Sequence, residues 1–428
     1  MFDGFRDAFH LPDLKRRILF VLGAFFVYRL GAHIPTPGID SDAMAKLFAQ
    51  GGVLGFLDLF AGGALRRFSV FALGVAPYIN SSIIMQLLVV VIPALERLQK
   101  HEGEDGRKKI VQYTRYGTIF FAVVQAIGLT TWLRSLGIFH GDALDWLVVV
   151  VTVTTGSVVV MWLGEIMSDH GIGNGISLLI YAGIVARMPD AIVSTGQLVA
   201  HGEMNPVVLV LAVIVMVAVI AGCVYLQDGQ RRLPVQYAKR MVGNKVYGGQ
   251  STFIPLKVNM SGVIPIIFAS SVLLFPYTLA NFFTGGVADA IRRAFSPSSP
   301  IYMIFYVALI VFFSYFYTAV VFNPSDIANN MKKYGGFILG IRPGKPTTDY
   351  IEKVMNRITL GGAVALAVVA LVPNFMSGVM RINTFYFGGT AILIVVGVAL
   401  DTVHQFEGQM LMRHYEGIIK RRNKSGLL

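Results

Sequence analysis

Four polar side chains interrupt an otherwise apolar stretch of the chain, ALGVAPYINSSIIMQLL, at positions 72–88. They are Asn80, Ser81, Ser82 and Gln86. Their hydroxyl and amide groups donate and accept hydrogen bonds but carry no charge, so they do not suit acid–base chemistry. Groups of this kind can line a hydrated path, or they can hold neighbouring helices together within lipid.

The spacing within this stretch predicts one functional helix face. Val75, Ile79, Ser82 and Gln86 follow one another at intervals of three or four residues. Such intervals bring side chains to the same side of a helix. The face is apolar toward Val75 and polar toward Gln86. Because Pro77 has no amide hydrogen, we expect it to bend the helix and to free the carbonyl group of Leu73.

The composition predicts a membrane protein that is not an enzyme. Hydrophobic residues make up 55% of the 428 positions and charged residues 14%, whereas soluble proteins carry roughly 25% charged residues. The sequence contains none of the metalloprotease, serine hydrolase or P-loop motifs. The histidines and the few charged residues of the apolar segments fall near segment ends. We therefore expect no catalysis, no cofactor or metal, and no ion coupling.

Apolar segments of membrane length predict ten spans. Nine are clear, at about 18–34, 69–92, 116–133, 146–163, 207–226, 258–280, 301–321, 358–373 and 385–403. A tenth segment, 176–188, is short and ends at Pro189. Most Lys and Arg residues lie in the two terminal regions and in the connections 93–115, 227–257 and 322–357. The positive-inside bias places all of these in the cytoplasm, which requires the segment 176–188 to cross as well.

Two pairs of segments resemble each other at an offset of five spans. GVAPYINSSI at 74–83 resembles GVIPIIFASSV at 262–272, and GISLLI at 175–180 resembles GTAILI at 389–394. Each copy places an isoleucine five residues after its glycine. An odd offset reverses the direction of crossing, so the pattern predicts two inverted halves with a functional path between them.

Two connections are longer than a compact membrane protein needs, namely 227–257 and 322–357. Both are about thirty residues long, basic and rich in Gly and Pro. Anionic lipids would account for part of this charge. The length favours docking of an acidic or RNA-bearing partner, with Arg342 presented between turn-forming residues.

Several motifs resemble the bacterial SecY family, the channel subunit of the Sec protein translocon. They are QYTRYG at 112–117, WLGEIMSDHGIGNGISLLI at 162–180, QRRLPVQYAKR at 230–240, LKVNMSGVIPIIFASS at 256–271, GIRPGKPT at 340–347 and FYFGGTAILIVVGVALD at 385–401. The resemblance covers nearly the whole chain. It implies an all-α polytopic fold of ten helices in two inverted pseudo-symmetric halves, at 1–188 and 189–428, with the terminal tail at 404–428.

The resemblance also implies four sets of functional residues. A pore ring of aliphatic side chains would consist of Val75, Ile79, Ile176, Ile180, Ile267 and Ile394. A plug helix at about 53–60 would contain Val53, Leu54, Phe56, Leu57, Leu59 and Phe60. The lateral gate would include Asn80, Gln86, Asn259 and Phe275. Partner docking would use Arg231, Arg232, Lys239, Arg240 and Arg342. Val75 replaces the family's usual Ile, so we expect a slightly looser ring.

The expected function is passive conduction of unfolded polypeptides, with lateral release of hydrophobic segments into lipid. The resemblance implies SecE-like and SecG-like small subunits, the SecA motor ATPase, the ribosome, signal-sequence-bearing polypeptides and anionic lipids as partners. The positive-inside bias places both termini in the cytoplasm, and we expect a bacterial plasma membrane because the sequence shows no transit peptide. Two alternatives remain, an inverted-repeat solute permease and an assembly scaffold without conduction.

Overall fold

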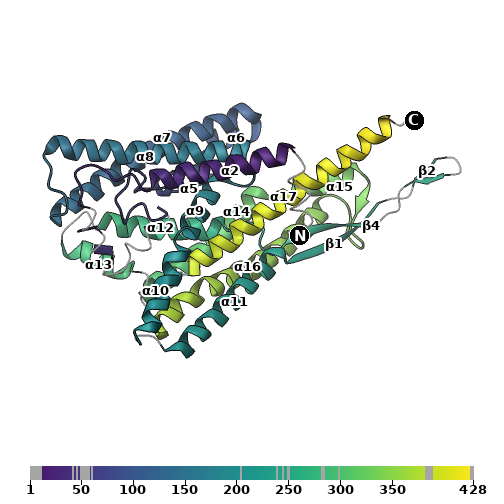
Figure 1. Ribbon diagram of the computed structural model, residues 1–428. Coiled ribbons are helices and arrows are strands. Elements are labelled where there is room, and N and C mark those ends of the chain that lie inside the picture. The colour runs from purple at the N-terminus through teal and green to yellow at the C-terminus, as the bar shows by residue number, and fades with distance from the viewer. Residues whose placement is uncertain are drawn as a thin grey trace.

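The computed structural model consists largely of long helices that run roughly along one another (Figure 1). It describes residues 12–40, 43–44, 47–48, 58, 61–202, 205–237, 240–242, 245–247, 251–280, 285–296, 299–380 and 389–424. A small sheet extends from the helices at the end where the C-terminal part of the last helix also lies (Figure 1).

The first half of the chain forms one group of helices. They are α2 (Pro12–Gly31), α5 (Ala76–Val91), α6 (Pro93–His101), α7 (Gly103–Ser135), α8 (Ala143–His170), α9 (Gly175–Val185) and α10 (Met188–Ala200). Helix α7 packs against both α5 and α8, and α8 also contacts α2 and α9. The segment 61–75, between α2 and α5, is a series of turns.

The second half forms another group. Its helices are α11 (Pro206–Asp228), α12 (Ile264–Ala280), α13 (Gly286–Ala294), α14 (Pro300–Val321), α15 (Pro324–Lys333), α16 (Lys345–Met380) and α17 (Gly389–Lys424). Helix α14 packs against α12 and α16, and α11 packs against α16 and α17. The predicted C-terminal tail is thus helical as far as Lys424, as a continuation of α17.

The two halves meet through the segments that echo each other in sequence. Helix α12 contacts α5, and α17 contacts α9. These helices contain the two related pairs that were noted at 74–83 and 262–272, and at 175–180 and 389–394. The repeated motifs therefore face one another at the centre of the molecule.

By length and composition, the described residues contain seven helices that can cross a membrane, or eight if the bent pair of α5 and α6 is counted as one span. The chain is thus a multi-pass membrane protein. Helix α12 is shorter, at 17 residues, and α2 has 20 residues but carries three basic ones at 15–17. The short fifth segment is part of a longer candidate, Gly175–Gln197, which combines α9 and α10.

The prolines differ in position from what we expected. Pro77 lies in the first turn of α5 and does not bend the helix. Proline is suited to a first turn because its missing amide hydrogen has no intrahelical partner there. The carbonyl of Leu73 is not freed, since it accepts a hydrogen bond from the Ala76 amide at 3.3 Å. Pro189 likewise does not end a helix but lies in the first turn of α10.

The sharp bend near this region lies at the other end of α5. Helices α5 and α6 meet at 103° across Ile92, and Pro93 starts α6. The residue before a proline prefers an extended backbone, and Ile92 adopts one with φ −99° and ψ 111°. Helix α5 therefore ends just before Ile92, because the residue that precedes Pro93 disfavours the helical backbone.

The two long basic connections form a compact unit instead of separate loops. Strands β1 (Gln230–Tyr237), β4 (Ser251–Lys257) and β5 (Gly336–Phe337) make a sheet in the order β4-β1-β5, and β2 (Arg240–Val242) pairs with β3 (Lys245–Tyr247). Leu233 and Val235 lie two positions apart on β1, so they share one face. They are buried there with Ile351 of α16. The fold is thus helical across the apolar region, with an added sheet that the expected all-α class did not include.

Candidate pore, gate and seal

The six residues predicted for the pore ring lie within the helical bundle. They are Val75, Ile79, Ile176, Ile180, Ile267 and Ile394, and all belong to or pack against one continuous apolar core. Five have side chains that are 1–4% exposed, and Ile176 is half-buried. They come from the start of α5 and from α9, α12 and α17, so both halves of the chain contribute.

Local hydrogen bonds set the direction of the ring residues on α9. The Asn174 side-chain oxygen accepts a hydrogen bond from the Ser177 amide at 3.1 Å and caps the helix. The Ser168 hydroxyl of α8 accepts one from the Gly175 amide at 2.8 Å. Satisfying these amides fixes the point at which α9 begins. The tight connection between α8 and α9 therefore determines where the α9 ring residues point.

A cavity of about 340 Å³ adjoins the ring. Ile79, Ile176, Ile180 and Ile267 of the predicted ring line part of it. Polar residues line much of the rest, namely Tyr78, Ser82, Gln86, Arg115, Glu165, Ser168, Asp169, Asn174, Ser177 and Tyr317. The cavity thus combines polar walls with aliphatic ones, and a narrow apolar passage can stop ions by dewetting.

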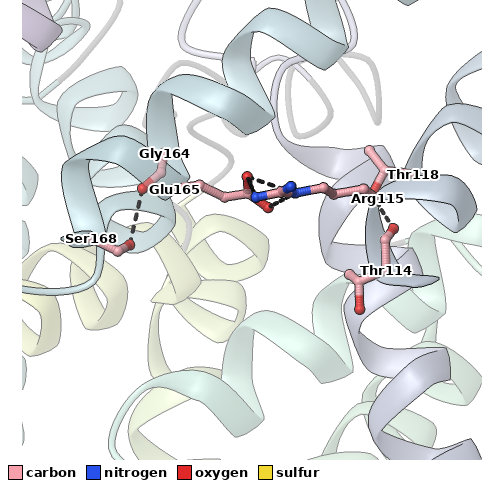
Figure 2. A network of polar contacts seen from close by, with 6 residues as sticks. All are labelled: Thr114, Arg115, Thr118, Gly164, Glu165 and Ser168. Atoms are coloured by element: carbon pink, nitrogen blue, oxygen red, sulfur yellow. Dashed lines mark hydrogen bonds and ion pairs between the residues drawn. The ribbon is translucent and has the colours of Figure 1, made fainter. Parts of the chain in front are cut away.

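An ion pair between α7 and α8 forms part of the cavity wall (Figure 2). The guanidinium group of Arg115 contacts both carboxylate oxygens of Glu165, with Nε–O distances of 3.0 and 3.1 Å and an Nη2–Oε2 distance of 2.9 Å. Arg115 is 49% exposed and Glu165 is 13% exposed. This bidentate geometry supports two orienting hydrogen bonds. The pair therefore connects the two helices beside the cavity.

This ion pair was not predicted from the sequence. Arg115 lies at the end of the basic connection 93–115, and Glu165 lies just beyond the apolar segment 146–163. The two residues are fifty positions apart, and their contact depends on how α7 and α8 are rotated about their axes. The sequence offered only one indication of this contact, namely a basic residue and an acidic residue at the ends of two neighbouring spans.

Two of the four predicted gate residues come together. Asn80 of α5 and Phe275 of α12 line a second cavity of about 60 Å³, to which Gln125 of α7 also contributes. Phe275 meets Phe121 of α7 edge to face, with ring centroids 5.9 Å apart. This cavity lies between the two halves, where a lateral opening would have to form.

The other two predicted gate residues lie elsewhere. Gln86 lines the larger cavity, and its amide nitrogen donates to the Ser82 hydroxyl at 3.2 Å. Asn259 is 6% exposed and organises the turn before α12. Its side-chain amide donates to the Gly262 carbonyl at 2.9 Å, and its oxygen accepts from the Ser261 hydroxyl at 3.1 Å.

The six apolar residues of the predicted plug all lie outside the described residues. They are Val53, Leu54, Phe56, Leu57, Leu59 and Phe60. Asp58, from the same stretch, is described and fully buried, and it forms an ion pair with Arg187 at 3.1 Å. Burial raises the pKa of the Asp58 carboxyl, and the Arg187 guanidinium and two backbone amides offset part of that effect.

The predicted docking residues are only partly described. Arg231 and Arg232 lie exposed on β1, and the Arg232 guanidinium stacks on the Phe253 ring at 4.7 Å. Arg342 is exposed in the turn before α16, where its carbonyl accepts a hydrogen bond from the Thr347 hydroxyl at 2.8 Å. Lys239 lies outside the described residues, and for Arg240 the structure describes only the backbone of β2. Pairing of β1 with β5 joins both basic connections in one unit.

No group of three His, Cys, Asp or Glu residues that could hold a metal ion occurs within the described ranges. Membrane-length helices surround a cavity that is lined by polar side chains and by four of the predicted ring residues, Ile79, Ile176, Ile180 and Ile267. The fold and the site together define a polytopic membrane protein of the channel type.

Comparisons with known proteins identify the family. The SecY family model matches residues 69–403. The protein translocase subunit SecY of Escherichia coli K12 is 48% identical over 427 residues, which cover 97% of this chain and 96% of the relative. The SecY subunit of Pseudomonas aeruginosa is 47% identical, with coverage of 97% and 95%. The chain belongs to the SecY family.

Solved structures support the fold. A structure described as a protein conducting channel aligns with a TM-score of 0.66 at 20% identity, covering 92% of this chain and 91% of that one. Sec61 from the canine ribosome–channel complex aligns with a TM-score of 0.61 at 18% identity and the same coverage. These similarities establish a shared architecture across nearly the whole chain.

Proposed function

We propose that this protein is the protein-conducting channel of a Sec translocon. It passes unfolded polypeptides across the membrane and releases hydrophobic segments sideways into lipid, without catalytic activity of its own. The observation that carries this function is the polar cavity whose wall includes four of the predicted ring residues, Ile79, Ile176, Ile180 and Ile267. Aliphatic side chains can close the ring against ions and still rearrange around a passing chain.

The two alternative functions have less support. The relatives that align over nearly the whole chain are protein translocase subunits, so a solute permease is not supported. An assembly scaffold would have no use for a polar cavity that ends at an apolar ring. Conduction uses both features.

The proposed topology has ten spans. The seven long apolar helices, the bent pair of α5 and α6, the shorter α12, and α2 would supply them. The halves 1–188 and 189–428 would be related by the inverted repeat. The sheet unit and both termini would face the cytoplasm of a bacterial cell, with the chain in the plasma membrane, because the basic residues gather on that side.

The proposed gate and seal use the predicted residues. The plug segment at 53–60 would close the ring from the outer side. The cavity that Asn80 and Phe275 line between α5, α7 and α12 would widen when the halves separate. Gln86, which lines the larger cavity, and Asn259, in the turn before α12, are the other two residues proposed for the gate.

The proposed partners follow from the basic sheet unit. Solved relatives include the canine Sec61 channel with a ribosome and an idle yeast Ssh1 complex bound to the 80S ribosome. We propose that Arg231, Arg232, Lys239, Arg240 and Arg342 contact the ribosome or a SecA motor, whose acidic or RNA surfaces would attract them. SecE-like and SecG-like subunits, signal-bearing polypeptides and anionic lipids complete the set.

Crosslinking tests the proposed function directly. A photoreactive side chain at position 79 should capture an exported polypeptide that has been arrested during transit. Absence of capture while export continues would contradict a path through the ring.

A further inference from the structure

A buried ion pair joins two parts of the chain that are far apart in sequence. Oδ2 of Asp58 lies 3.1 Å from Nη1 of Arg187, with the Asp58 side chain fully buried and that of Arg187 17% exposed. Arg187 lies between α9 and α10, at the end of the helix that carries the ring residues Ile176 and Ile180. The pair therefore connects Asp58 to the C-terminal end of the helix that carries these predicted ring residues.

The Asp58 carboxylate also accepts hydrogen bonds from the turn that follows it, at residues 61–66. Oδ1 of Asp58 accepts hydrogen bonds from the amides of Leu65 and Arg66, each at 3.0 Å. The carbonyl of Asp58 accepts another from the Gly63 amide at 3.1 Å. A carboxylate that receives several amide donors is well satisfied at low exposure. Asp58 and the turn 61–66 thus form one compact unit.

A second arginine ties this turn to α2. Nη1 of Arg29 donates to the Gly62 carbonyl at 3.2 Å. Gly62 has φ +63°, and a Cβ atom there would lie 2.9 Å from the Cα of Gly183 in α9 and 2.9 Å from the Tyr28 hydroxyl oxygen. Only glycine fits so close an approach at this backbone conformation. The turn is therefore seated between the ends of α2 and α9.

The backbone of Arg187 is itself held in place. Its amide donates to the Ile184 carbonyl at 3.1 Å, and its carbonyl accepts from the Ala191 amide at 3.1 Å. These bonds connect it to the end of α9 on one side and to α10 on the other. The guanidinium group thus extends from a fixed point toward the Asp58 carboxylate.

We propose that the Asp58–Arg187 ion pair is the latch that holds this unit against α9 in the closed channel. The inference rests on the proposed function and adds positioning residues that the ring and gate assignments do not contain. A buried pair contributes little net stability, but loss of one partner leaves an unpaired buried charge, which is strongly unfavourable. The channel should therefore stay closed when both charged partners are present or when both are replaced by neutral residues, but not when only one is replaced.

The first test removes one partner. Arg187→Met keeps a long unbranched side chain but leaves the buried Asp58 charge unpaired. Resting ion conductance of the purified complex in planar bilayers should rise by on the order of tenfold or more. Arg67→Met is the matched control, because it makes the same change at an exposed position in the same segment. It should leave the conductance unchanged.

The second test restores neutrality. Asp58→Asn combined with Arg187→Met removes both charges and keeps a side-chain oxygen for the Leu65 and Arg66 amides. The latch predicts that this double variant leaks much less than Arg187→Met alone. A cysteine at Ala61, which is 2% exposed, reports the position of the unit through labelling by a membrane-impermeant maleimide. Labelling should accelerate in Arg187→Met and slow again in the double variant.

Specific outcomes would overturn the latch. These are equal leak in Arg187→Met and Arg67→Met, or a double variant that leaks as much as Arg187→Met. If Arg187→Met does not accumulate, the double variant decides, since a tightly sealed protein supports the latch and a failure to accumulate contradicts it. Failure of the proposed function would differ, because the unmodified complex would then transport no polypeptide at all.

Discussion

At the scale of single residues, closure of the proposed pore ring would depend on aliphatic volume at a few buried positions. Ile79 and Ile267 come from opposite halves, are 3% and 4% exposed, and both line the larger cavity. Replacing both by Ser would shorten the side chains and place hydroxyl groups in the constriction, so water and ions could enter. We expect resting conductance of the reconstituted complex to rise several-fold.

The control for the ring is Ile84→Ser. Ile84 lies on the same helix but is 40% exposed, away from the core. It should leave the conductance at the level of the unmodified protein. An unchanged conductance in the Ile79→Ser, Ile267→Ser variant would contradict the assignment of these residues to the ring.

At the residue scale, the sequence was most informative where the residue type and its position in a repeat pointed to the same place. The isoleucines at 79, 180, 267 and 394 occupy equivalent positions in the two echoes, and the structure places all four in one core. The Arg115–Glu165 and Asp58–Arg187 pairs were not foreseen. Each joins residues of ordinary type across helix ends or faces whose mutual rotation the sequence does not specify.

At the scale of elements, helix packing depends on positions without a side chain. Gly156 of α8 is such a position, because a Cβ atom there would overlap the backbone carbonyl of Val70. Gly156→Ala should lower the free energy of unfolding by about 1–3 kcal/mol, since a backbone group cannot move aside as a side chain would. The thermal unfolding of the purified protein measures this.

Gly361→Ala provides the comparison. Gly361 lies within α16, and a Cβ atom there would meet nothing within 4 Å. Alanine stabilises an unobstructed helix by roughly 0.5–1 kcal/mol relative to glycine. Equal unfolding temperatures for the two alanine variants would show that the approach of α8 to Val70 is not a tight one.

The exposed arginine in the turn before α16 allows a test of partner docking. Arg342→Glu reverses an exposed charge, while the Thr347 hydroxyl still bonds to the backbone carbonyl at position 342. The fold of the turn should persist, but partner-driven secretion should be lost because the acidic or RNA surface would be repelled. Secretion by cells that carry only the variant measures the effect.

A charge reversal on another element serves as the control for docking. Arg293→Glu changes an exposed position on α13, which lies away from the sheet (Figure 1). It should support normal secretion. Normal secretion by the Arg342→Glu variant as well would remove Arg342 from the docking surface.

Elements were predicted from sequence with uneven success. Apolar length located the membrane helices, but it treated Pro77 and Pro189 as breakers when both lie in first turns. A proline restricts the chain before it, so the start of a helix and a bend within one give similar sequence patterns. The sheet was missed because its short apolar alternation at Leu233 and Val235 lies among charges, glycines and prolines.

At the scale of the whole molecule, the proposed inverted halves would place the path at the centre. Helix α5 packs against α12 and α9 against α17, so each echoing segment meets its counterpart. Both cavities lie where the halves face each other. A sequence repeat predicts such an interface because related segments tend to surround the axis that relates them.

The central claim is that polypeptides pass through the ring, and crosslinking from position 79 tests it most directly. A photoreactive residue replaces Ile79, and a second variant carries it at Val148, which is 49% exposed on α8. Export of a signal-bearing polypeptide is arrested midway before illumination. The account predicts capture of the arrested chain from position 79 and none from position 148. Equal capture at both positions, or capture at neither while export proceeds, would contradict it.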